Sequence, residues 1–467
     1  MAAPRKRKKT PQKRSSQGEK VDVRALCLEV LAEFEQRDAY VNLILNQRIF
    51  DHSLSHNERG FLTELVRGVL QRLNTIDWAL SLYLNRPLEK LTPWIRNILR
   101  MGAYQLLYLD YVPDAAAVDE SVKLAHRYGH KGVSSLVNAV LRKISIEKDN
   151  IPWPSPEEGE DYLSIIYSHP RWVINRWLKN LGWEETEALC RANNTPSPFT
   201  VRVNTLRFTR EDLKETLKEE GIEASECRFS PWGLELGGLP RRLTEINSFQ
   251  RGLFQIQGEA SMLVAPALNP QPGEDVLDLC SAPGGKTIHA AMLMENSGKI
   301  IAADLYPQRL KLVEKAAVQL GADIVRTIST DGRNLPLKMH SSFNRVLLDV
   351  PCSGLGVLRR KGDLKWRRRP EDISSLSELQ LKLLKEAFSA LCPGGVLLYS
   401  ACTTEPEETV QVINAFLEEE PGAYLTPLSP FLPEALVSPE EEGMAYFWPH
   451  KHNLDGFFLA RLRKNTG

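Results

Sequence analysis

The first third of the chain repeats apolar residues at helical spacing. One stripe comprises Phe61, Leu62, Leu65, Val66, Val69, Leu70 and Leu73. A second comprises Val137, Val140, Leu141 and Ile144. Thr92 followed by Pro93 is typical of a helix N-terminus. We therefore predict an all-α domain over residues 21–145, in which the stripes are core positions rather than catalytic ones.

Two shorter stretches follow the helical domain. Residues 146–161 are rich in proline and acidic side chains, which predicts a linker. Alternating Phe199, Val201 and Val203 predict a strand, and a helix should run from Thr209 to Glu220. We therefore predict a small α+β module over residues 162–254.

Further along, short apolar runs alternate with helical segments. The runs that predict buried strands are residues 274–280, 299–305, 322–330, 343–350 and 395–402. This alternation is typical of a mostly parallel sheet with crossover helices. We therefore predict an α/β, Rossmann-like domain over residues 255–467. Ligands of such sheets bind at the carboxyl ends of the strands, so we expect the functional site there.

Composition and charge narrow the class of protein. Hydrophobic residues make up 42% of the 467 residues and charged residues 25%, which excludes a wholly disordered, collagen-like or disulfide-scaffold chain. The net charge is zero, but residues 1–20 carry eight basic side chains and one acidic one. We predict that this tail is disordered. It is interpreted as a solubilising arm, a nonspecific anchor to phosphate, or a targeting address.

The seven cysteines are scattered and form no CxxC pair. This arrangement favours a reducing compartment and disfavours a structural zinc site. No apolar run reaches 18 residues, and no hydrophobic signal segment follows the basic tail. We therefore expect a cytoplasmic protein with no bound metal and no membrane contact.

A glycine turn follows the first predicted strand, in the sequence LDLCSAPGGKT at residues 277–287. A P-loop would need glycine where Cys280 stands, and the dinucleotide fingerprint GxGxxG is absent. An ordinary turn is one alternative; a loop for S-adenosylmethionine, which need not clasp phosphates, is the other. Asp304 and Asp331 end the next two predicted strands, where they can accept hydrogen bonds from ribose hydroxyls and an adenine amino group.

Two cysteines stand at neighbouring strand ends. Cys352 follows Asp349 in DVPCSG, and Cys402 lies in YSACTT. A lone cysteine is commonly a small core residue. A pair beside a carboxylate suits methylation of a pyrimidine at C5, because a thiolate that adds to C6 makes C5 nucleophilic toward a sulfonium methyl group. An acid must meanwhile hydrogen-bond or protonate N3, and a base must later remove the C5 proton.

These three motifs, with PHKHNLDGFFLARL at residues 449–462, resemble the Nop/Sun family of RNA cytosine-C5 methyltransferases, and in particular its bacterial 16S ribosomal RNA enzymes. The helical start, including VNAVLRK at residues 137–143, is similar to a NusB-like RNA-binding domain. The resemblance covers residues 21–465. It implies that the chain transfers methyl from S-adenosylmethionine to a cytosine of 16S rRNA, and that the small α+β module also binds RNA.

The resemblance also implies roles for single residues. Cys402 corresponds to the family's nucleophile, and Cys352 to the cysteine that assists product release. Asp349 is expected to contact N3 of the cytosine. The expected cofactor contacts are Cys280, Ser281, Ala282, Pro283, Gly284, Gly285, Lys286, Asp304, Asp331 and Asp349.

Some positions depart from the family pattern. Gly258 stands where aspartate is usual, Ala401 where a hydroxyl residue usually precedes the nucleophile, and Thr409 where asparagine is common. These departures concern the positioning of the loops rather than the reaction. Residues 359–369, RRKGDLKWRRR, hold seven basic side chains. They are interpreted either as a solvated loop or as a phosphate-binding loop in which Trp366 stacks or packs.

Two other functions compete with this prediction. A DNA cytosine methyltransferase would place its nucleophile in the Pro–Cys motif. A noncatalytic RNA-binding assembly factor would use only the basic tail and the helical domain. The paired cysteines and the intact cofactor loop favour an RNA methyltransferase, with 16S rRNA as its partner and a monomer as its expected state.

Overall fold

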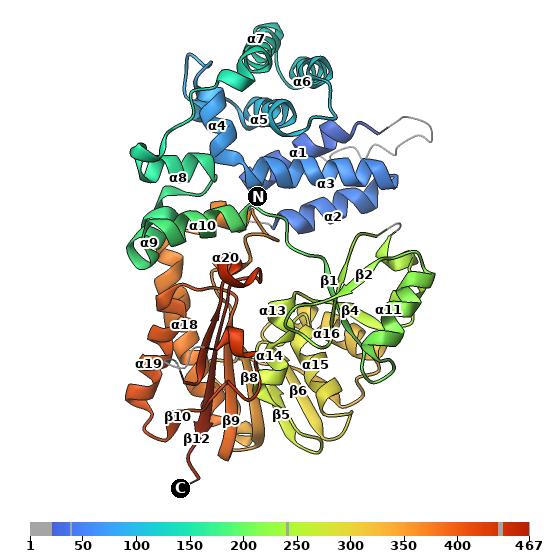
Figure 1. Ribbon diagram of the computed structural model, residues 1–467, viewed down its shortest axis with the longest axis vertical. Helices are drawn as coiled ribbons and strands as arrows, with labels where there is room; N and C mark the ends of the chain where they lie inside the picture. The colour runs from blue at the N-terminus through green and yellow to red at the C-terminus, as the bar shows by residue number, and fades with distance from the viewer. Residues whose placement is uncertain (1–20, 38–39, 240–241, 438–441, 467) are drawn as a thin grey trace, which may run out of the picture. The chain divides into compact units, whose positions relative to one another are not determined.

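The computed structural model describes residues 21–37, 40–239, 242–437 and 442–466 (Figure 1). The predictions for the basic tail lie outside the described residues. The chain divides into two compact units, the first ending at Ile151 and the second beginning at Pro152. That division falls within the expected linker, residues 146–161.

The first unit is all-α, as predicted. Its helices are α1 Val23–Gln36, α2 Val41–Asp51, α3 His56–Gln71, α4 Leu73–Ser81, α5 Pro93–Tyr108, α6 Asp114–Tyr128 and α7 Lys131–Glu147. The first apolar stripe lies mainly on α3 and the second on α7. Both face one shared core, which accounts for their spacing. Helix α5 begins at Pro93 with Thr92 as its N-cap residue, as the sequence predicts.

The second unit opens with three helices, α8 Glu160–Ile166, α9 Arg171–Leu181 and α10 Trp183–Asn193. Their buried side chains, among them Leu163, Val173 and Trp177, belong to the same core as the large sheet described below. The helices that precede the small sheet therefore support the large domain as well.

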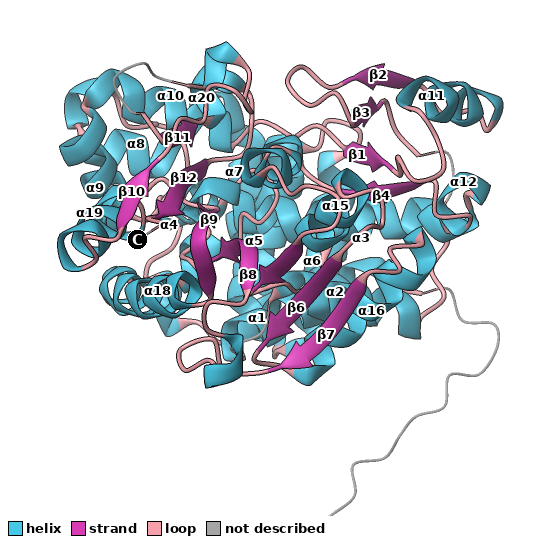
Figure 2. Cartoon of the chain, turned by 90° about the horizontal axis from the view of Figure 1, so that it is seen from below, coloured by secondary structure: helices cyan, strands magenta, loops and turns pink. Residues whose placement is uncertain are grey.

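A small antiparallel sheet follows, with strands in the order β2–β3–β1–β4 (Figure 2). Its elements are β1 Thr200–Val203, α11 Arg210–Glu219, β2 Ala224–Glu226, β3 Gly233–Leu236, α12 Asn247–Gln250 and β4 Phe254–Ile256. The predicted strand and helix are both present. The Thr209 hydroxyl caps α11 by accepting a hydrogen bond from the Asp212 N–H at 3.1 Å. The sheet has its own core around Val201, Leu213 and Phe254.

Within the described residues, the large sheet has eight strands in the order β10–β12–β9–β8–β5–β6–β7, with β11 beside β12. The parallel strands are β5 Asp275–Asp278, β6 Lys299–Asp304, β7 Val325–Ser329, β8 Phe343–Asp349 and β9 Leu391–Ala401. Each overlaps one of the predicted runs, although β9 begins four residues earlier than predicted, and the Rossmann-like prediction is confirmed. The antiparallel strands, which the sequence analysis did not predict, are β10 Ala423–Leu425, β11 Met444–Phe447 and β12 Phe457–Lys464.

Helices cover both faces of this sheet. One face carries α13 Glu259–Met262, α14 Val264–Leu268, α15 Gly285–Leu293 and α16 Pro307–Leu320. The other carries α18 Pro370–Ser389 and α19 Val410–Glu419. Successive strand residues alternate between the two cores, so Leu347 packs on the first side and Leu348 on the second. Two further short helices are α17 Leu364–Arg367 and α20 Pro449–His452. No described helix is both long and apolar enough to cross a membrane.

Candidate functional site

The predicted site residues gather at one edge of the large sheet. Strands β9, β8, β5 and β6 are neighbours. Cys402, Asp349, Cys280 and Asp304 stand at or just beyond the last residues of these strands, in that order. Because the carboxyl ends of parallel strands share one edge, the cysteine motifs and the predicted cofactor loop face a common region.

The two predicted catalytic cysteines touch. Sγ of Cys352 lies 3.1 Å from Sγ of Cys402. The hydrogen bond from Cys352 lowers the pKa of Cys402 against the opposing effects of burial and of the Asp349 charge, and the charges of Lys286 and Lys361 lower it further. The same hydrogen bond, together with burial, raises the pKa of Cys352 well above its usual value. The first proton to leave the pair therefore comes from Cys402, and the second stays on Cys352.

Lys286 links the cofactor loop to the cysteine motifs. Its ammonium forms an ion pair with Oδ1 of Asp349 and lies 3.4 Å from Oγ of Ser400, to which it donates. Ser400 in turn donates to Oδ1 of Asp349 at 2.6 Å. The ammonium also lies 5.1 Å from the centre of the Phe457 ring, a cation–π contact. Asp349 is therefore held from two sides.

The glycine loop turns tightly between β5 and α15. The Ser281 N–H donates to the Ala303 carbonyl at 2.9 Å, and the Gly284 N–H donates to the Ser281 carbonyl at 2.7 Å. Gly284 has φ +101°, and a Cβ there would lie 3.1 Å from Cα of Val313. Glycine is thus required for both its conformation and its close approach. Helix α15 then begins at Gly285 and presents its N-terminus at the sheet edge.

Asp304 lies buried at the end of β6. Its Oδ1 accepts from the Tyr306 N–H at 3.0 Å, and its Oδ2 lies 3.3 Å from the Arg309 guanidinium. Arg309 also donates to the Ala282 carbonyl at 2.8 Å, which ties this carboxylate to the glycine loop. Oγ of Ser281 is buried with no hydrogen-bond partner among the described residues. A hydroxyl without a partner and a carboxylate at this edge suit a ligand rich in ribose hydroxyls.

Two further aspartates differ in their surroundings. Asp278, at the end of β5, is fully buried and accepts from the Thr287 hydroxyl at 2.6 Å. Burial raises its pKa to about 7. Asp331 lies just beyond β7, where both carboxylate oxygens engage the Arg333 guanidinium, which lowers the pKa of Asp331. A contact between Asp331 and an adenine stays a prediction.

The basic segment at residues 359–369 serves contacts within the protein. Arg359 donates to three main-chain carbonyls, and Arg360 donates to Asp455 at 2.7 Å. Arg368 donates to two carbonyls of the Pro–Cys motif at 2.8 and 3.0 Å. These contacts hold the three arginines within the protein, and phosphate binding by the segment stays a prediction. Counting charges could not reveal that main-chain oxygens from distant segments hold them.

The three departures from the family pattern are accommodated locally. A Cβ at Gly258 would lie 2.8 Å from Oδ2 of Asp455, so a larger residue there would require Asp455 to move. Ala401 is fully buried. The Thr409 hydroxyl donates to the Glu405 carbonyl at 2.8 Å.

Sequence reasoning missed several residues that shape this edge. Ser400 lies inside the YSACTT motif, and Arg309 lies five residues after Asp304. Glu408, directly before Thr409, is buried between the cysteine motifs. Each lies near a predicted site residue, but its role depends on tertiary contacts that the sequence does not show.

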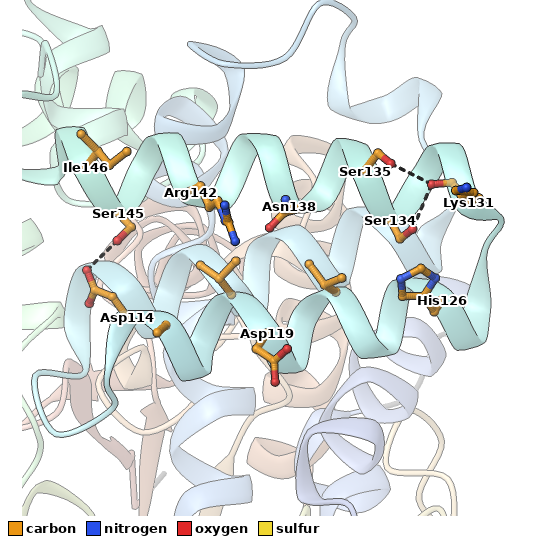
Figure 3. A pocket seen from close by; sticks show the side chains of 13 residues that line it. Asp114, Asp119, His126, Lys131, Ser134, Ser135, Asn138, Arg142, Ser145 and Ile146 are labelled. Atoms are coloured by element: carbon orange, nitrogen blue, oxygen red, sulfur yellow. Dashed lines mark hydrogen bonds between the residues drawn. The ribbon is translucent and has the colours of Figure 1, made fainter.

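The first unit contains a groove of about 750 Å³ between α6 and α7, lined by both polar and apolar side chains (Figure 3). Arg142 and Asn138 point from α7 toward α6, and Lys131 stands at one end of the groove. Asp114 is already bonded to the Ser145 hydroxyl at 2.8 Å. The cationic and amide donors make this groove suitable for an anionic chain. Among the described residues, no group of three or more His, Cys, Asp or Glu is placed to hold a metal ion.

Comparison with known proteins matches three parts of the chain to family models. The model of 16S rRNA methyltransferase RsmB/F matches residues 265–463, the NusB family model residues 21–145, and the ferredoxin-like domain model of RsmF/B-like methyltransferases residues 169–239. A protein of Bacillus subtilis (strain 168), "Probable ribosomal RNA small subunit methyltransferase B", is 39% identical over 450 residues, which are 95% of this chain and 99% of that protein.

Solved structures agree with these matches. The crystal structure of PH0851 has a TM-score of 0.80 at 29% identity and covers 96% of this chain and 100% of its own. NSun6 from Pyrococcus horikoshii, solved with SFG, an analogue of S-adenosylmethionine, has a TM-score of 0.57 at 27% identity and covers 63% of this chain and 98% of its own. The chain belongs to the RsmB/F family of 16S rRNA methyltransferases, and its methyl donor is S-adenosylmethionine.

Proposed function

We propose that the chain methylates C5 of a cytosine in 16S rRNA through a covalent bond between Cys402 and C6 of the base. The observation that carries the proposal is the 3.1 Å contact between Cys352 and Cys402, with Lys286 and Asp349 paired beside them. Methylation of a nitrogen or a ribose hydroxyl needs no thiol pair, because those atoms are already nucleophilic. A pyrimidine C5 becomes nucleophilic only after an addition at C6.

In the first step, Cys402 attacks C6 as a thiolate, which its lowered pKa favours. The addition moves electrons toward N3, which takes up a proton from solvent and donates it to the Asp349 carboxylate in a hydrogen bond. Lys286 holds Asp349 in place for that contact. S-adenosylmethionine, when bound by residues 280–286, Asp304 and Asp331, supplies the electrophilic methyl group.

In the second step, Cys352 first gives its own proton to solvent; its thiolate then takes the C5 proton, N3 releases the proton it had taken up, and Cys402 leaves C6 as a thiolate. The main causes of the raised pKa of Cys352 include its hydrogen bond to Cys402 and the charge of that sulfur. Both disappear while Cys402 is bonded to C6, so the pKa of Cys352 falls at the stage that requires a base. Cys352 thus loses a proton and regains one during one turnover, and Cys402 ends as the thiolate with which it began.

The test is methyl transfer to purified 16S rRNA, followed by bisulfite sequencing. We expect the wild type and Cys392→Ala to protect one cytosine from conversion, and Cys402→Ala to protect none. Cys392 is a matched control because it lies near the start of β9, whereas Cys402 follows its last residue. Methyl incorporation at a base nitrogen or a ribose would contradict the proposal.

A further inference from the structure

The two cysteine loops leave the sheet before the thiols meet. The last main-chain hydrogen bond between β8 and β9 runs from the Val350 N–H to the Ser400 carbonyl at 2.9 Å. Cys352 and Cys402 each lie two residues beyond these partners. Strand pairing alone therefore does not fix the separation of the two sulfur atoms.

A single carboxylate joins the two loops at this point. Oε1 of Glu408 accepts from the Ser353 N–H at 2.7 Å, and Oε2 accepts from the Thr403 hydroxyl at 3.3 Å. Ser353 directly follows Cys352, and Thr403 directly follows Cys402. The two hydroxyls are also 3.1 Å apart, which closes a ring of hydrogen bonds beside the thiol pair.

Glu408 is itself held firmly. Its side chain is fully buried, and Gln380 on α18 donates both to its Oε1 at 3.1 Å and to the Pro351 carbonyl at 3.0 Å. The Tyr399 hydroxyl donates to the main-chain carbonyl of Glu408 at 2.7 Å. Burial raises the pKa of Glu408, while the hydrogen bonds from Ser353 and Gln380 oppose that rise. A buried acceptor that receives this many hydrogen bonds has little freedom to move.

We propose that Glu408 is a positioning residue that sets the distance between the two thiols by bonding to the residue after each cysteine. The effect of Glu408 on catalysis rests on the proposed function, whereas its effect on the distance between the two thiols does not. Two other roles make different predictions. An acid–base group would depend on the charge of the carboxylate, and a simple filler of the core would affect stability without affecting the thiols.

Two conservative variants separate these roles. Glu408→Gln keeps the length of the side chain and loses its charge. Its amide oxygen can still accept from Ser353 and Gln380, and its NH₂ can donate to the Thr403 hydroxyl. Glu408→Asp keeps the charge and is one methylene shorter, so it must release one loop. Positioning therefore predicts that the glutamine variant resembles the wild type and that the aspartate variant does not.

The measurement is the outcome of reaction of the full chain with oxidised glutathione. The Cys402 thiolate attacks a glutathione sulfur, which forms a mixed disulfide and releases glutathione thiolate. The Cys352 thiolate then displaces the second glutathione and forms an internal disulfide. The ratio of internal to mixed disulfide, read by peptide mass, reports the proximity of the thiols without RNA or cofactor. Cys352→Ala, which can form only the mixed species, calibrates the assay.

We expect the wild type and Glu408→Gln to form mainly the internal disulfide, and Glu408→Asp to shift roughly tenfold toward the mixed species, as the loss of one charge-assisted hydrogen bond implies. Thr403→Val, which removes one contact without shortening Glu408, should shift in the same direction. Wild-type ratios in both Glu408→Asp and Thr403→Val would overturn the proposal. A shift in Glu408→Gln as large as that in Glu408→Asp would also overturn it, because charge rather than reach would then matter.

Kinetics connect this geometry to turnover. Glu408→Asp should slow both formation and release of the protein–RNA adduct while leaving S-adenosylmethionine affinity unchanged, since the described hydrogen bonds of the Glu408 carboxylate come from Ser353, Thr403 and Gln380. Unchanged adduct kinetics alongside a shifted disulfide ratio would refute a catalytic consequence of the positioning. Absence of any adduct in the wild type would instead refute the covalent mechanism and leave the disulfide result standing.

Discussion

Replacing Cys352 with alanine should raise the pKa of Cys402. The hydrogen bond across 3.1 Å is the largest influence on that pKa, and it lowers it. A hydrogen bond to a charged acceptor contributes about 1.5–3 kcal/mol, and a thiol is a weak donor, so the low end applies. At about 1.4 kcal/mol per pKa unit, the loss corresponds to a rise of about one unit. Burial would then oppose ionisation with only Lys286 and Lys361 to offset it.

The assay is alkylation of Cys402 by iodoacetamide between about pH 6 and 10, followed by peptide mass analysis. Because the thiolate is the reactive form, the midpoint of the rate profile gives the pKa. We expect the midpoint of Cys352→Ala to move up by about one unit and its rate at neutral pH to fall roughly tenfold. Cys392→Ala should leave the profile unchanged. A midpoint that stays in place or moves down in Cys352→Ala would refute the assignment of Cys402 as the thiolate of the pair.

Asp304→Ala should weaken S-adenosylmethionine binding by about 1–3 kcal/mol, because ribose hydroxyls lose their acceptor; unchanged calorimetric affinity in the folded variant would contradict that contact. Burial raises the pKa of Asp278 from 3.8 to about 7, so the native state keeps a proton that the unfolded chain releases. Wild-type stability should therefore fall by about 3 kcal/mol as pH rises from 4 to 7. Asp278→Asn should remove that loss, and parallel urea-unfolding curves for both proteins would refute it. Lys131→Ala with Arg142→Ala should lower RNA affinity and reduce its salt slope by about 2, whereas equal slopes would place the RNA contact outside the α6–α7 groove.

The sequence predicted those elements whose own residues determine them. The apolar stripe on α3 has the period of a helix, and the runs that became β5 and β8 are apolar because both sheet faces are covered. The site residues were also predictable, because parallel strands bring their ends together. Asp349 and Cys402 are expected at one edge of the sheet whatever the order of the strands.

Features that depend on distant partners could not be predicted in this way. Strand β12 pairs with β9 across more than fifty residues, and its antiparallel direction follows from a return path that no local pattern encodes. The hydrogen bonds of Arg368 to two carbonyls of the Pro–Cys motif have no local signal in the sequence. Glu408 lies in a short acidic run, and its burial depends on tertiary contacts such as the hydrogen bond from Gln380 on α18.

The central claim is that Cys402 attacks the base and Cys352 assists its release, and a denaturing gel tests this claim directly. Each variant is incubated with 16S rRNA and S-adenosylmethionine and examined for a protein–RNA species that survives denaturant. We predict that Cys352→Ala forms this adduct and retains methylated RNA, because it can attack but cannot complete release. Cys402→Ala should form none, because the attacking sulfur is absent. An adduct from Cys402→Ala but not from Cys352→Ala would reverse the two roles and contradict the account.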